Sequence, residues 1–125
     1  MAILPDIIID SKNRAVATYI FSNQGILNLK KVDNQIIEQR LNISNENLIS
    51  YLENDMLNGR INESFFNEES NEFIFKYQLN GSYNGKGILN VITLKQDVAL
   101  YETYSKQLQD IINLKVNVKQ IKKHS

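Results

Sequence analysis

The first forty residues have the apolar patterns of β-strands, either short apolar runs or alternation with a period of two. A β-branched run at 7–9 predicts one strand, and the segment 15–21, apolar on both faces, predicts a central one. Two further strands follow, marked by Leu27, Leu29, Ile37, Leu41 and Ile43. Polar turns separate the four strands. We therefore expect an antiparallel β-meander over about residues 3–43.

A helical spacing of apolar residues begins directly after this meander. Leu48, Ile49, Leu52 and Met56 fall on one helical face. Ser44 suits the N-cap position, because its hydroxyl can accept a hydrogen bond from a free backbone N–H of the first turn. Asn58-Gly59 is a good C-terminal stop. The pattern predicts a helix over 45–57.

Strict alternation returns at residue 72, where Phe73, Phe75, Tyr77 and Leu79 share one face of a strand. Asn84-Gly85 is the dipeptide favoured in type I′ turns. A turn centred there pairs Tyr77 with Ile92 and Phe75 with Leu94. We expect a β-hairpin over 72–95. The preceding segment, 60–71, has no clear period, and we interpret it as a short helical turn or an ordered loop.

The last pattern is helical again, and Asp97 can cap it. An apolar stripe predicts a helix over 98–112. Its Tyr101 and Tyr104 are expected to pack in the core, with contact at an interface as the alternative. Residues 114–122 fit either a strand or a continuation of this helix, because the run is too short to separate the two periods. The chain is thus expected to be one α+β domain, 1–125, with a partly mobile basic segment at 115–125 that forms a C-terminal strand or helix extension.

The composition excludes many kinds of catalytic and metal site. The chain has no cysteine, so thiolate nucleophiles and Cys-based zinc sites are impossible. Its one histidine, His124, lies beside the C-terminus, so a Ser-His-Asp triad is not expected. Residues 81–87 fail the phosphate-loop pattern, because the spacing is one residue short and a strand follows. We expect no metal, no cofactor and no enzymatic activity, and we interpret Tyr83 as an exposed contact at a hairpin tip.

A formal net charge of zero conceals a strong division along the chain. Residues 41–75 carry seven acids and one base, a net charge of −6, whereas residues 76–125 carry eight lysines and three acids, a net charge of +5. The two regions either pack together or present opposite surfaces that steer a partner. Two candidate contact sets lie in them: the acidic set Glu63, Glu68, Glu69 and Glu72, and the basic set Lys115, Lys119, Lys122 and Lys123.

These observations favour a small non-enzymatic protein–protein interaction module, such as an adaptor, inhibitor or structural subunit. It would bind a protein partner, associate with itself, or both, and the acidic set and Tyr83 are the partner-binding candidates. The alternative is nucleic-acid binding by the basic set, which would also suit an acidic protein surface. An enzyme that uses only carboxylate, lysine or tyrosine side chains would need a pocket with a strongly perturbed group. We expect a cytoplasmic protein without membrane contact, and the abundance of Ile, Asn and Lys indicates a low-GC bacterium, its phage or a mobile element.

Overall fold

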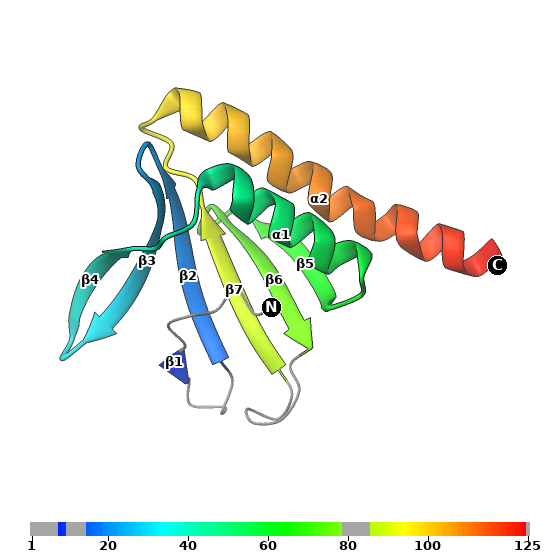
Figure 1. The fold of residues 1–125 in the computed structure, drawn as a ribbon, viewed down its shortest axis with the longest axis horizontal. Coiled ribbons are helices and arrows are strands. Elements are labelled where there is room, and N and C mark those ends of the chain that lie inside the picture. Colours follow the sequence, from blue (N-terminus) through cyan, green and yellow to red (C-terminus); the bar gives the residue numbers. More distant parts are fainter. Residues whose placement is uncertain (1–7, 10–14, 79–85, 125) are drawn as a thin grey trace.

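The computed structural model describes residues 8–9, 15–78 and 86–124, which form two layers (Figure 1). One layer is a seven-stranded sheet with the order β4-β3-β2-β7-β6-β5, in which β1 pairs with the start of β2. The other layer consists of the helices α1 and α2, which contact each other on one face of the sheet. The expected α+β class is confirmed. The elements are β1 (Ile8–Ile9), β2 (Ala15–Ser22), β3 (Gly25–Val32), β4 (Gln35–Arg40), α1 (Asn45–Leu57), β5 (Ile61–Asn67), β6 (Glu72–Gln78), β7 (Lys86–Ile92) and α2 (Val98–His124).

The N-terminal meander has the predicted pairing. β1 to β4 pair in sequence order, each antiparallel to the next. Asp33 and Asn34 join β3 to β4 with φ angles of 50° and 65°, as a type I′ turn requires. Gly25 has a φ of 103° where the chain enters β3, a conformation that favours glycine. The part of the predicted meander before Ile8 lies outside the described residues.

A parallel pairing of β2 with β7, which the sequence pattern does not predict, completes the sheet. Ala17 lies beside Leu89 and Tyr19 beside Val91. β7 is also antiparallel to β6, so it joins the N-terminal meander to the C-terminal strands. The predicted central strand therefore lies at the centre of the sheet, with β3 and β1 on one side and β7 on the other.

The interpretation of residues 60–71 as a helical turn or loop is wrong, because residues 61–67 form the outer strand β5. A register shift between Ile61 and Glu63 interrupts the period of two. As a result Ile61 and Ser64, three residues apart, are both buried. The sequence of β5 therefore does not alternate regularly, because of this bulge and because the polar residue Ser64 occupies a buried position.

The hairpin of β6 and β7 exists, but its predicted register is wrong. Tyr77 lies opposite Gly87 and Phe75 opposite Leu89, rather than opposite Ile92 and Leu94. In the observed register Leu89 and Val91 join the core together with Phe73 and Phe75. Core packing therefore favours the observed register of the two strands, and Asn84-Gly85 lies outside the described residues.

The two helices confirm the predicted caps. The Ser44 hydroxyl accepts a hydrogen bond from the Asn47 N–H at 3.1 Å, and the Asp97 carboxylate accepts one from the Leu100 N–H at 3.3 Å. α1 has the predicted bounds. α2 continues to His124, which decides the alternatives for residues 114–122 in favour of a helix.

The sheet-facing sides of both helices enter a single core. Leu48 and Leu52 of α1 and Leu108 of α2 are fully buried in one cluster with the sheet side chains. The Tyr104 ring stacks on Phe21 with ring centroids 4.5 Å apart, as expected for a core tyrosine, while Tyr101 is half-buried. Neither helix of the described chain is long and apolar enough to cross a membrane.

Candidate functional site

β3 and β4 leave the main sheet as a two-stranded arm, which we define as residues 29–40. β3 pairs with β2 only up to Asn28, whereas its pairing with β4 continues to the turn at Asp33. Figure 1 shows the arm projecting to the left, away from α1 and α2. An isolated two-stranded hairpin is marginally stable in water at best, so an arm of this kind gains little from its own packing.

Every side chain of β4 is exposed, including two adjacent isoleucines. The exposed fractions are 73% for Ile36 and 44% for Ile37. Successive residues of a strand point to opposite faces, so each face of the arm carries one exposed isoleucine. The alternation places Ile37 and Leu41 on the same face, but only Leu41 is buried. Ile37 stays exposed because its partner on β3, Lys30, lies beyond Asn28, where the pairing of β3 with β2 ends.

Among the described strands none pairs with the outer edge of β4, so this edge also offers backbone groups without a strand partner there. In a two-residue hairpin the residues that flank the turn, here Val32 and Gln35, exchange hydrogen bonds, and bonded pairs then recur at every second residue. The hydrogen bond from the Leu41 N–H to the Ile26 carbonyl, 2.8 Å, agrees with this phase. The N–H and C=O groups of Ile36, Glu38 and Arg40 therefore point away from β3.

The other outer strand, β5, is better protected against strand addition than β4. It contains the register shift at Ile61/Glu63, and Glu63 forms an ion pair with Lys76 at 3.2 Å. Bulges and charged side chains are common protection for an exposed sheet edge. β4 pairs with β3 through six consecutive residues without a bulge, and its outer half, Gln35-Ile36-Ile37, carries no charge. The arm is thus the less protected edge.

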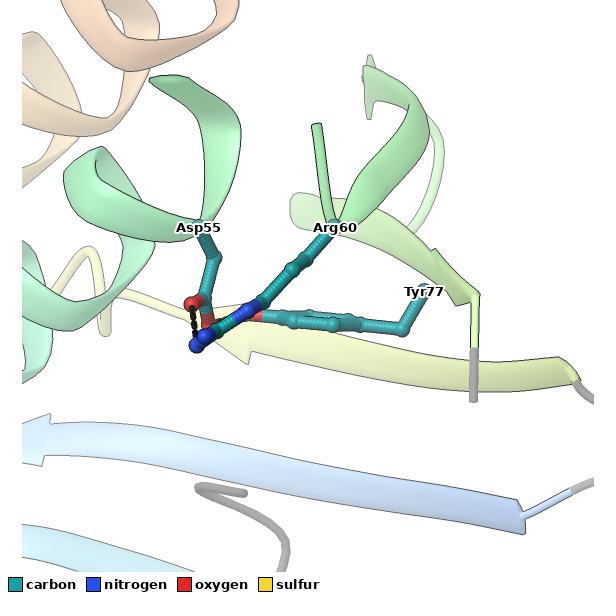
Figure 2. Close-up of polar contacts among 3 residues, drawn as sticks. All are labelled: Asp55, Arg60 and Tyr77. Carbon is teal, nitrogen blue, oxygen red and sulfur yellow. Dashed lines mark hydrogen bonds and ion pairs between the residues drawn. The ribbon is translucent and has the colours of Figure 1, made fainter. Parts of the chain in front are cut away.

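A second candidate is a polar cluster in which the buried Asp55 and Tyr77 meet the exposed Arg60 (Figure 2). The Tyr77 hydroxyl donates a 2.8 Å hydrogen bond to one oxygen of Asp55, and the Arg60 guanidinium donates a 3.2 Å bond to the other. The carboxylate comes from the last turns of α1, and the tyrosine comes from β6. The cluster therefore joins the helix layer to the sheet.

The environment of Tyr77 suits a structural role better than proton transfer. Burial raises the pKa of Tyr77 far above its usual range, and the adjacent Asp55 carboxylate raises this pKa further. A general acid or base works best with a pKa near the working pH. Tyr77 instead stays protonated as a hydrogen-bond donor to a carboxylate that is already paired with Arg60.

The acidic set predicted from the sequence is spread along the hairpin of β5 and β6. Glu68 and Glu69 are exposed in the turn between β5 and β6, and Glu72 begins β6. Glu63 lies further along β5, where it pairs with Lys76. Among the described residues, no group of three or more acidic or histidine side chains is arranged to hold a metal ion.

The remaining predicted contacts cannot be placed in a site. Tyr83 lies outside the described residues. Lys115, Lys119, Lys122 and Lys123 lie in the last turns of α2, where the helical backbone is described but the side chains are not. The acidic and basic regions as wholes do pack together, since α1 contacts α2 and β6 pairs with β7.

Comparison with protein families, with curated proteins and with solved structures finds no match to this chain. The candidate site is therefore defined by its own geometry. Sequence reasoning missed Ile36, although a signal was present. An apolar residue stands there in the polar phase of an alternating strand, directly beside Ile37 and two residues after a type I′ turn.

Proposed function

We propose that the chain is a protein-binding module that docks through its arm. The observation that carries this proposal is that β4 exposes all six side chains, two of them isoleucines, beside a free backbone edge. Strand addition to such an edge uses the backbone for affinity and the alternating side chains for specificity. Burying one isoleucine stabilises a complex by roughly 1.5–3 kcal/mol, a free energy that the exposed arm does not gain.

The test compares two exposed apolar residues on different elements. Ile36→Asp alters the arm, and Val98→Asp alters the first residue of α2, which has an exposed fraction of 60%. Each variant and the wild-type chain would serve as bait in an extract of the source cells. We expect Ile36→Asp to lose the proteins captured by the wild type and Val98→Asp to retain them. Equal capture by all three baits would contradict the proposal.

A second candidate function is nucleic-acid contact through the end of α2. It is favoured by one observation, the continuous helical backbone, because Lys115, Lys119 and Lys122 then follow at helical spacings of four and three residues. Binding to phosphates would weaken as the salt concentration rises. In a plot of log affinity against log salt concentration, the double variant Lys119→Ala/Lys122→Ala would reduce the slope by about two. Absence of retention on DNA and RNA at low salt would exclude this function.

A further inference from the structure

A cleft of about 270 Å³ lies between α1 and α2. Its floor includes Ile49 and Ile111, which belong to the core, and its sides include the exposed Glu53, Leu57 and Asp110. The cleft lies between the two helices, whereas the arm projects away from both of them (Figure 1). It is thus an apolar groove with acidic sides, on a part of the molecule separate from the arm.

The cleft has an apolar end and an acidic section one helical turn before it. Leu57 and Leu114 line the apolar end, one from each helix, and Leu57 has an exposed fraction of 50%. Glu53 and Asp110 each precede one of these leucines by four residues, which is about one turn of a helix. Because α1 and α2 run in the same direction (Figure 1), the two carboxylates share one level of the cleft and the two leucines share the next.

The two carboxylates of this acidic section are not neutralised within the described chain. Glu53 and Asp110 form no ion pair or side-chain hydrogen bond with a described residue. Glu46, by contrast, accepts a hydrogen bond from the Tyr104 hydroxyl at 3.0 Å. α1 contains no basic residue, and Lys106, one turn before Asp110 on α2, forms no ion pair with it. A partner that brings cations to this section therefore gains an attraction that the isolated chain lacks.

The size of the cleft favours a few side chains of a larger partner over a complete small-molecule ligand. Pockets for drug-sized ligands usually measure about 300–1,000 Å³, more than this cleft provides. Between Ile49 and Leu57 the cleft follows α1 for about 12 Å. A helix in a groove contacts it through residues spaced by three, four and seven positions, which cover about 10.5 Å. The cleft thus has the length of two turns of a partner helix.

We propose that this cleft binds a helical segment of a protein partner that carries a large aliphatic side chain and a lysine or arginine one turn apart. The aliphatic side chain packs between Leu57 and Leu114, and the cation lies between Glu53 and Asp110. The same two carboxylates repel nucleic acids and anionic membranes from the cleft. This contact goes beyond the docking role proposed for the arm and does not depend on it.

Two synthetic helical peptides test the charge requirement on the full chain. Both carry leucines along one stripe, and one has lysines a turn away from the leucines where the other has glutamates. Each is titrated to about 1 mM, where even a weak complex is populated, and binding is followed through the backbone amide shifts of the chain. We expect shifts at Glu53, Leu57, Asp110 and Leu114, and about tenfold tighter binding of the lysine peptide at low salt. Equal affinity for the two peptides, or shifts confined to β4, would overturn the inference.

Two double variants separate the cleft from the net charge of the chain. Glu53→Lys/Asp110→Lys reverses the acidic section, and Glu68→Lys/Glu69→Lys makes the same change of charge in the exposed turn between β5 and β6. We expect the first to prefer the glutamate peptide and the second to keep the preference of the wild type. An unchanged preference in the first variant would contradict the proposed site. Ile36→Asp should bind the lysine peptide as the wild type does, so failure of the cleft and failure of the arm can be distinguished.

Discussion

At the residue scale, the Asp55 carboxylate shows how a buried charge is accommodated in this chain. Its two oxygens accept hydrogen bonds from Tyr77 and Arg60, so the charge is both paired and solvated by protein groups. Removing one partner of such a group leaves it unsatisfied, and the cost exceeds the net worth of the bond. Arg60 adds a backbone link, because its carbonyl accepts a hydrogen bond from the Gln78 N–H at 2.9 Å.

Tyr77→Phe is expected to lower the free energy of unfolding by about 1–3 kcal/mol, because one oxygen of Asp55 loses its donor inside the core. Tyr51→Phe is the control, since Tyr51 lies on the exposed face of the same helix as Asp55. Urea denaturation would measure both variants. Equal stabilities for Tyr77→Phe and the wild type would show that the cluster contributes nothing.

The same tyrosine predicts a loss of stability at alkaline pH. An unperturbed tyrosine loses its proton near a pKa of about 10, whereas burial raises the pKa of Tyr77 well above this value in the folded chain. Above pH 10 the unfolded chain therefore binds fewer protons than the folded chain. For this group the free energy of unfolding then falls by about 1.4 kcal/mol per pH unit, while below pH 10 its contribution stays constant.

Denaturant titrations from pH 8 to pH 11.5 would test the alkaline effect. The curve of Tyr77→Phe should be shallower than that of the wild type above about pH 10, because the variant lacks this titration. Burial also raises the pKa of Tyr104, so some pH dependence should remain in the variant. Parallel curves for the two proteins would argue against a protonated, buried Tyr77.

At the element scale, local chemistry determines where helices and turns begin and end. The predicted helix caps are confirmed at Ser44, Asp97 and Asn58-Gly59, and a turn forms at Asp33-Asn34. These features depend only on neighbours a few residues away in the chain. Gly25 combines such a local requirement with a long-range one. A Cβ atom at this position would lie 2.9 Å from the Ile43 carbonyl oxygen, in the segment that connects the arm to α1.

Two glycines allow these requirements to be separated. Gly25 and Gly59 both have positive φ angles, but nothing lies within 4 Å of a Cβ atom built on Gly59. Gly59→Ala should cost about 1–2 kcal/mol from its backbone conformation alone. Gly25→Ala should cost more, because a backbone segment must also move. Thermal denaturation would compare the two, and an equal or smaller cost at Gly25 would contradict the close approach to Ile43.

The elements that sequence reasoning missed are those that depend on distant parts of the chain. β5 lacks a simple period because its bulge brings Ile61 and Ser64 to the same face. The register of β6 and β7 follows from the packing of Leu89 and Val91 beside β2 as well as beside β6. The position of Ile37 outside the core depends on where β3 separates from β2. None of these three features can be predicted from a segment of ten residues alone, because each depends on strands that are distant in the sequence.

At the scale of the whole molecule, one side of the chain is a well-packed body and the other is an exposed arm. The parallel pairing of β2 with β7 joins the N-terminal and C-terminal strands in one sheet, and the core lies between this sheet and the two helices. The acidic α1 packs against the more basic α2, which brings the two regions of the predicted charge division into contact. The β4 strand of the arm has no buried side chain, so a change on its surface is not expected to disturb the packing of the body.

This separation predicts that arm variants affect docking rather than folding. Ile36→Asp should change the free energy of unfolding of the chain by less than about 0.5 kcal/mol, as for other exposed positions. Leu52→Ala, in the core side of α1, should cost about 2–5 kcal/mol under the same conditions. A large loss of stability for Ile36→Asp would show that the arm belongs to the folding core.

Residue-resolved amide hydrogen exchange along β4 tests docking on the arm most directly. Ile37 and Gln39 bond to β3 in any state of the folded chain, whereas the N–H groups of Ile36 and Glu38 point outward and need an added strand for protection. We predict that Ile36 and Glu38 gain protection when a protein captured by the wild-type chain is added, and that Ile37 and Gln39 are protected with and without it. Fast exchange at Ile36 and Glu38 in the complex, with Ile37 and Gln39 protected, would contradict the account.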